Sequence, residues 1–254
     1  MNDKELKDFL EAKVYQYHQP EFLKDDPVSI PHRFSKKEDI EICGFLTATI
    51  AWGNRKSIIK SANRLMELME WEPYRYVMAY HKDQSETLSG FVHRTFNDED
   101  LNYFFGALKH LYTVYGGLEP IFARYESKNN LQSAITAFKG HFFELDHPGR
   151  STKHISDPGK GSAAKRINMF LRWMIRKNSG GVDFGIWKSL DPKQLSCPLD
   201  VHSGRVARKL GLLERKQNDA KAVVELDKKL RQLDPEDPVK YDFALFGLGV
   251  FEKF

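Results

Sequence analysis

Two short stretches of the chain contain the residue types best suited to chemistry. One is the turn Asp157-Pro158-Gly159-Lys160-Gly161-Ser162, and the other is Ser196-Cys197-Pro198-Leu199-Asp200-Val201-His202, which holds an isolated acid. Glycine lets a backbone approach a phosphate, whose charge is stabilised by free amides and by the positive end of a helix. With a helix beginning near Ser162, Gly159 and Gly161 predict a phosphate contact, for which DNA backbone is one suitable partner. A purely structural turn is the alternative.

Asp200 is the acid with the strongest claim to a catalytic role. It precedes a helix-like segment, VHSGRVARKLGLL, that carries Arg205, Arg208 and Lys209. An aspartate immediately before a helix usually caps the free amides of the first turn, which is the structural alternative. A carboxylate at that place can also stabilise a developing positive charge. The two roles are compatible, and Asp200 is therefore our candidate catalytic residue.

Positive charge is concentrated in residues 150–177, where Asp157 is the only acid. The basic residues of this stretch are Arg150, Lys153, Lys160, Lys165, Arg166, Arg172, Arg176 and Lys177. In the helix predicted after the turn, the apolar side chains share one stripe, and Lys165, Arg172 and Arg176 fall on the opposite side. We expect a basic face that meets phosphates, with a merely solvated helix face as the alternative.

The elements that position these residues are predicted to be helices. Ser35-Lys36-Lys37-Glu38 has the form of a capping box before the apolar run ICGFLTATIAW, and Gly53-Asn54 ends that pattern. Helical spacing of apolar residues recurs over 58–69, 100–115 and 131–145, and a loop covers 146–162. Strand patterns and hairpin turns are scarce in the sequence. The chain is therefore predicted to be all-α.

Three further residues are predicted to have structural roles. Tyr241 and Asp242 follow Pro238 at a predicted helix start, where capping is expected. Trp173 is expected to pack rather than to stack on a base, because large rings dominate ordinary cores. None of the three is a candidate catalytic residue.

Composition excludes several classes of protein. The 41% hydrophobic and 29% charged residues indicate a globular chain. No apolar run approaches the roughly 20 residues that span a bilayer, and the N-terminal stretch is charged and amphipathic, so we expect a cytoplasmic location and no membrane contact. Cys43 and Cys197 are too few for an all-cysteine iron–sulfur ligand set, and we expect neither metal nor cofactor. The net charge of +4 does not by itself identify a polyanionic partner.

The two chemical stretches resemble a known superfamily. GSAAKRINMFLRWM followed by CPLDVHSGRVARKLGLL is similar to the helix-hairpin-helix (HhH-GPD) superfamily of DNA glycosylases, and Asp200 matches its catalytic aspartate. Further matches to the surrounding pattern are Pro198, His202, Arg205, Val206, Arg208, Leu210 and Gly211. DIEICGFLTATIAWGNRKSIIKSANRLMELM is similar to the superfamily's early helix pair, and the likeness covers about residues 35–251. The closest likeness is to an uncharacterised bacterial family labelled only as a domain of unknown function.

The resemblance implies an architecture. It is an all-α, HhH-GPD-like single unit over 1–254, with two helical subdomains flanking a cleft that receives an extruded nucleotide. Subdomain A is expected at about 35–145, preceded by an N-terminal helix within 1–34. Subdomain B is expected at about 150–254 and carries the turn and the Asp200 loop.

The resemblance also implies a base-excision repair glycosylase that removes a damaged or mismatched base from duplex DNA. The superfamily's hairpin lysine is replaced by Ala163, so Lys165 or Lys160 must supply any Schiff-base amine beside Asp200. The residues implied to contact DNA are Gly159, Gly161, Ser162, Arg166, Arg172, Arg176, His202, Arg205, Asn54 and Arg55. We expect a monomer acting on double-stranded DNA of the bacterial nucleoid. The alternative is a non-catalytic member of the same fold that binds DNA or RNA.

Overall fold

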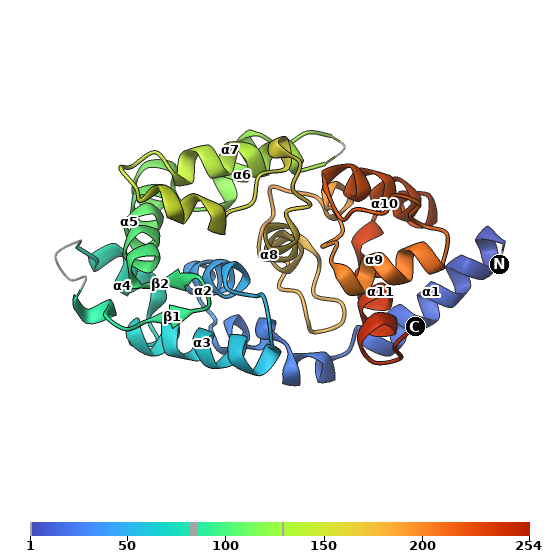
Figure 1. Ribbon diagram of the computed structural model, residues 1–254, viewed down its shortest axis with the longest axis horizontal. Coiled ribbons are helices and arrows are strands. Elements are labelled where there is room, and N and C mark those ends of the chain that lie inside the picture. The colour runs from blue at the N-terminus through green and yellow to red at the C-terminus, as the bar shows by residue number, and fades with distance from the viewer. Residues whose placement is uncertain (1, 82–85, 129) are drawn as a thin grey trace. The chain divides into compact units, whose positions relative to one another are not determined.

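The computed structural model describes residues 2–81, 86–128 and 130–254, and helices dominate these residues (Figure 1). The strands in this part of the chain are β1 (Val92–His93) and β2 (Phe96–Asn97), an antiparallel pair in which Val92 faces Asn97 and His93 faces Phe96. The prediction of a helical fold class is therefore confirmed. None of the described helices is long and apolar enough to cross a membrane.

The chain divides into two compact units. Unit 1 contains Met1–Phe22, Glu126–Ser133 and Asp157–Phe254, and unit 2 contains Leu23–Tyr125 and Ala134–Ser156. The N-terminal helix α1 (Asp3–Tyr17) therefore belongs with the C-terminal half of the chain, whereas the expectation placed residues 1–34 before the first subdomain. The reason is that the apolar side of α1 packs against α11 (Tyr241–Val250).

Unit 2 is built around α2, in which every residue from Ile40 to Thr49 is buried. Its main helices are α2 (Lys37–Thr49), α3 (Arg55–Leu68), α4 (Pro73–Ala79), α5 (Asp98–Tyr115), α6 (Glu119–Arg124) and most of α7 (Gln132–Phe142). Short 3-10 turns η2 (Pro27–Ser29), η3 (Pro31–Arg33) and η5 (Gly149–His154) complete it, and η1 (Pro20–Asp25) contains the boundary between the two units. The expected capping box is wrong, because the residue before α2 is Lys36, which makes no side-chain capping bond.

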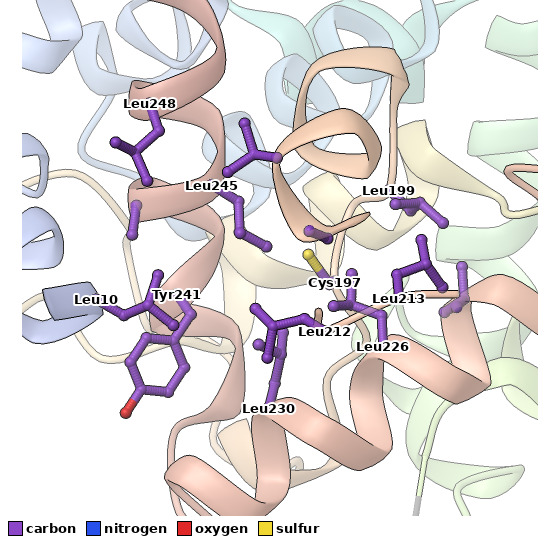
Figure 2. Packing of buried hydrophobic residues seen from close by; sticks show 14 of the residues in the cluster. Leu10, Cys197, Leu199, Leu212, Leu213, Leu226, Leu230, Tyr241, Leu245 and Leu248 are labelled. Atoms are coloured by element: carbon purple, nitrogen blue, oxygen red, sulfur yellow. The ribbon is translucent and has the colours of Figure 1, made fainter. Parts of the chain in front are cut away.

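Unit 1 carries both stretches singled out for chemistry. Its remaining elements are η6 (Pro158–Lys160), α8 (Lys165–Ile175), η7 (Pro192–Gln194), α9 (Val201–Lys209), α10 (Ala220–Leu233) and η8 (Pro238–Lys240). Figure 2 shows its apolar core, in which Leu10 of α1, Leu226 and Leu230 of α10 and Leu245 of α11 surround the segment before Asp200. Cys197 and Leu199 are buried in this cluster. The backbone that leads to Asp200 is therefore fixed by core packing.

Candidate functional site

Asp200 caps α9 through one of its two carboxylate oxygens. Oδ1 accepts hydrogen bonds from the amides of His202 (2.8 Å) and Ser203 (3.0 Å) and from the Ser203 hydroxyl (3.2 Å). The Asp200 amide in turn donates to Ser203 Oγ at 2.9 Å, which closes a capping box. The capping prediction is confirmed, and these bonds fix the direction of the carboxylate.

The second oxygen of Asp200 faces Lys165. Lys165 Nζ lies 3.5 Å from Asp200 Oδ2, and 32% and 20% of the two side chains are exposed. Lys165 is the first residue of α8, so the pair joins the starts of two helices. A pair that is shielded but still reached by solvent can meet a substrate without a rearrangement of the core. Lys160 lies exposed on η6 and forms no ion pair with Asp200 in the part of the chain described.

The backbone before Lys165 reverses direction sharply. Ala164 has φ 47° and ψ 38°, a left-handed conformation that costs an L-residue about 1–2 kcal/mol. Local bonds hold it there: the Ala164 amide donates to Ser162 Oγ (3.1 Å) and Asn168 Nδ2 donates to the Ala163 carbonyl (3.0 Å). Both alanines are buried. Strain of this kind is often retained where it positions a functional group, here the first side chain of α8.

A neighbouring loop holds the Asp200 segment from the other side. Asn218 Nδ2 donates to the Asp200 carbonyl at 2.8 Å, and Asn218 Oδ1 accepts from Arg208 at 2.7 Å. Gly204 makes this approach possible, because a Cβ there would lie 2.7 Å from Asn218 Oδ1. Sequence reasoning missed Asn218, since a loop asparagine gives no signal of what it contacts.

The glycine turn differs from its prediction. The amides of Gly159 and Lys160 donate to Asp157, as does the Ser162 amide, and the Gly161 amide donates to Pro158. The prediction of free amides for a phosphate is therefore wrong, because Asp157 and Pro158 already accept these hydrogen bonds. Gly161 adopts the left-handed φ of 88° that a tight turn requires. The helix begins at Lys165 rather than near Ser162, and Ser162 pairs with Asp219 in an isolated bridge.

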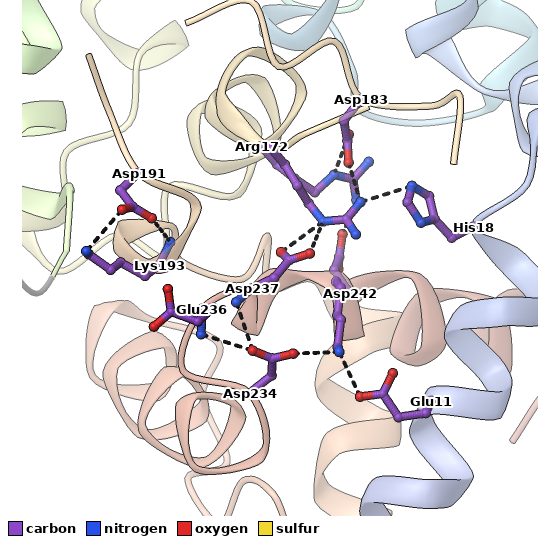
Figure 3. A network of polar contacts seen from close by, with 12 residues as sticks. Glu11, His18, Arg172, Asp183, Asp191, Lys193, Asp234, Glu236, Asp237 and Asp242 are labelled. Carbon is purple, nitrogen blue, oxygen red and sulfur yellow. Dashed lines mark hydrogen bonds and ion pairs between the residues drawn. The ribbon is translucent and has the colours of Figure 1, made fainter. Parts of the chain in front are cut away.

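The basic face predicted for α8 is also wrong for Arg172 and Arg176, which are buried and ion-paired. Figure 3 shows Arg172 among its partners. Arg172 donates to Asp183 Oδ1 (3.2 Å) and to Asp242, and Arg176 donates to Asp183 Oδ2 (2.9 Å). Arg176 also donates to both oxygens of Asp237 at 3.0 Å and to His18 Nε2 at 3.0 Å. A helical wheel places these arginines correctly away from the apolar stripe, but other segments of unit 1 cover that side.

The other residues predicted to contact DNA do not extend the Lys165–Asp200 ion pair with their side chains. His202 and Arg205 are exposed on α9, where Arg205 also donates to the Gly249 carbonyl at 2.8 Å. Arg166 is half-buried, and burial lowers its pKa to about 10, so the guanidinium remains protonated at neutral pH. Asn54 and Arg55 belong to unit 2, where Asn54 caps α3 by accepting from the amides of residues 56 and 57.

A protein-family model matches residues 26–251, and its description is "Protein of unknown function (DUF2400)". The match covers nearly all of the chain. This chain belongs to the DUF2400 family. Searches of curated proteins and of solved structures gave no match. The expectation of a family of unknown function is therefore confirmed, while kinship of DUF2400 to the glycosylases stays a prediction.

The DUF2400 chain has one more acid close to the pair, which the sequence analysis assigned to capping. Asp242 is buried in the first turn of α11, accepts from Arg172, and lies 3.7 Å from the Cys197 thiol through Oδ1. The capping role is wrong, because the residue before α11 is Lys240. Burial raises the pKa of Asp242 to about 6, Arg172 opposes that rise, and the charge of Asp200 adds to it. A single acid in an otherwise apolar helix was the available signal.

Two other features of the DUF2400 chain bear on its chemistry. Trp173 is fully buried, which confirms its packing role. Across the described residues, no group of three or more histidine, cysteine, aspartate or glutamate side chains is arranged to hold a metal ion.

Proposed function

We propose that this chain is a base-excision repair DNA glycosylase that acts on a damaged or mismatched base in duplex DNA and uses Lys165 as a lyase nucleophile. The observation that carries the proposal is the 3.5 Å separation of Lys165 Nζ and Asp200 Oδ2. An amine and a carboxylate in contact, both partly exposed, supply a nucleophile together with a group that stabilises positive charge. The likeness of the Asp200 loop to that of the glycosylases adds support.

The chemistry begins at the bond between the base and the sugar. An extruded nucleotide gives side chains access to C1′. When the N-glycosidic bond breaks, its electron pair leaves with the base, which takes up a proton, and the sugar gains positive charge. The Asp200 carboxylate stabilises that charge, because its direction is already fixed by the bonds to Oδ1.

Lys165 acts on the resulting sugar. After its ammonium gives up one proton, the amine forms a bond to C1′. One of the two protons on the attached nitrogen moves to the ring oxygen as the C1′–O4′ bond breaks, which opens the ring and leaves a protonated imine. Asp200 Oδ2 is the proton acceptor adjacent to this nitrogen. Removal of a C2′ proton then expels the 3′ phosphate, and hydrolysis of the imine releases the lysine.

Capping alone does not account for the arrangement of Asp200. The cap uses Oδ1, whereas Oδ2 is directed to a side chain of another helix. An aspartate that only capped α9 would need no lysine there. The alternative function, binding of DNA or RNA without chemistry, can use an exposed amine but does not require a carboxylate in contact with it.

Borohydride trapping tests the proposal. A panel of duplexes, each with one damaged or mismatched base or an abasic site, is incubated with the protein, and borohydride reduces any imine to a stable amine. We expect a covalent protein–DNA adduct on a denaturing gel, and we expect Lys165→Gln to abolish it. Lys160→Gln is the matched control, because it removes an equal charge from the exposed turn and should leave the adduct intact.

Two results would contradict parts of the proposal. An adduct that persists in Lys165→Gln but disappears in Lys160→Gln would transfer the nucleophile to the turn. Binding to every duplex with no release of base or strand would favour the non-catalytic alternative.

A further inference from the structure

A second site lies in unit 2, on the side of α3 that faces the segment leading into β1. It is a pocket of about 320 Å³. Two cations, Lys60 and Arg64, contribute to its lining, together with three serines, and none of the described lining residues is an aspartate or a glutamate. The described lining therefore carries a net positive charge, and Asp98 accepts a hydrogen bond from the amide of the lining residue Gly90 at 3.1 Å. Its volume falls at the lower end of the range usual for small-ligand sites, about 300–1,000 Å³.

Several hydrogen-bond donors in this pocket make no hydrogen bond to any described residue. Lys60 Nζ and the hydroxyls of Ser57 and Ser89 have no partner among the residues that the structure describes. Arg64 forms one exposed ion pair, with Nη1 3.3 Å from Glu67 Oε2, and such pairs contribute only about 0–1 kcal/mol. A ligand anion can therefore compete for the guanidinium at little cost.

The third serine, Ser61, is hydrogen-bonded to His93. His93 Nε2 lies 3.3 Å from the Trp52 carbonyl, which can only accept, so Nε2 carries the proton. Burial lowers the pKa of His93, which favours the neutral ring, and Nδ1 then accepts from the Ser61 hydroxyl at 2.9 Å. Ser61 is thus held by β1, leaving the two cations and the hydroxyls of Ser57 and Ser89 as the available donors.

This donor set suits one chemical class. The ammonium, guanidinium and hydroxyl groups of α3, together with the Ser89 hydroxyl from the segment before β1, match the several acceptor oxygens of a tetrahedral oxyanion. Charge-assisted hydrogen bonds of this kind are about twice as strong as those between neutral groups. The apolar side chains of Leu68, Leu88 and Phe91 also line the pocket and can contact the carbon part of an ester. We infer that the α3 pocket binds a phosphate group.

The phosphate could belong to a free phosphate compound or to the backbone of a nucleic-acid strand. Lys56 precedes Lys60 by one helical turn and lies outside the pocket, so positive charge continues along α3 beyond it. The only acid of α3, Glu67, lies in its last turn. The inference does not depend on the proposed glycosylase activity, because the Lys165–Asp200 pair belongs to the other unit.

Nuclear magnetic resonance on the ¹⁵N-labelled full chain tests this assignment. One arm titrates inorganic phosphate and the other a short undamaged duplex, both at constant ionic strength. We expect saturable shifts of the amides of Ser57, Ser61, Ser89 and Phe91. Shifts with both probes identify a site for free phosphate compounds, and shifts with duplex alone identify a site for the strand backbone.

Two variants distinguish a specific site from general surface charge. Lys60→Gln is expected to weaken binding about tenfold, because it removes a charge-assisted bond. Lys56→Gln removes the same charge from the same helix outside the pocket and should change affinity by less than about twofold under screening salt. Both lysines are exposed, so the fold should be kept. The inference is wrong if neither probe shifts the pocket amides, or if the two variants weaken binding equally.

Discussion

Replacing Asp200 in two ways should separate its capping role from its chemical role. Asparagine is as good an N-cap as aspartate, and its amide oxygen can accept the same bonds that Oδ1 accepts from the first turn of α9. Alanine removes the cap altogether. We therefore expect Asp200→Asn to unfold at nearly the wild-type temperature, and Asp200→Ala to lose about 0.5–2 kcal/mol of stability.

The loss of the lysine partner adds little to either change. Because the Lys165–Asp200 pair is partly exposed, its contribution to stability is at most about 1 kcal/mol. For a chain of this size each kcal/mol moves the melting temperature by about 2–4 °C. Thermal unfolding should thus show a clear decrease for the alanine variant and a small one for the asparagine variant.

Activity should follow a different order. Both variants lack the negative charge that, in the proposed mechanism, stabilises the sugar, so we expect each to lower the rate of base release about 100- to 1,000-fold. The assay is single-turnover cleavage of the best duplex found in the panel, with binding measured in parallel. If Asp200→Asn cleaves at close to the wild-type rate, or if it is as unstable as Asp200→Ala, the division of the two oxygens between cap and chemistry is wrong.

Three further changes test the contacts around the site. Arg172→Met leaves the buried Asp242 without its arginine and removes one of the two arginines that pair with Asp183. It should cost about 3–5 kcal/mol, measured by urea unfolding; an unchanged midpoint would mean that the buried pairs contribute nothing. The His18 pKa is lowered from 6.5 to about 4, chiefly by burial and then by the Arg176 charge, so its contribution is present above pH 6.5 and is lost as the pH falls towards 4. His18→Gln should remove that part of the pH dependence, and the difference in unfolding free energy between wild type and variant at the two ends of this window measures it. Gly204→Ala should lower stability by about 1 kcal/mol, since its Cβ would displace the neighbouring loop side chains, whereas Gly140→Ala, with open space around it, should raise stability by about 0.5–1 kcal/mol in a thermal melt.

The local elements of the fold could largely be predicted from sequence. The paired helices α2 and α3, the long α5 and the cap at Asp200 follow from apolar spacing and from residue types that act over one turn. Such signals are local, because they depend on neighbours three or four residues away.

The wrong predictions concern tertiary contacts, that is, which distant segments pack against each helix or turn. A helical wheel shows that Arg172 and Arg176 avoid the apolar stripe, but not that Asp183, Asp237 and Asp242 cover them. Those partners come from separate segments, and a buried ion pair has the same local pattern as a solvated one. The prediction of free amides in the glycine turn was wrong for a related reason. Asp157 accepts hydrogen bonds from most of these amides, and the sequence does not show which acceptor a turn amide will find.

The buried arginines have a consequence for the lysine at the opposite end of α8. Arg172 lies seven residues after Lys165, about 10 Å along a helix axis, and its two carboxylate partners immobilise that end of α8. The lysine nitrogen therefore extends from a helix whose position is already fixed. If Lys165 is the nucleophile that we propose, only the torsions of its side chain remain to be ordered against the sugar, and most of the entropy of alignment is lost during folding and not at the moment of reaction.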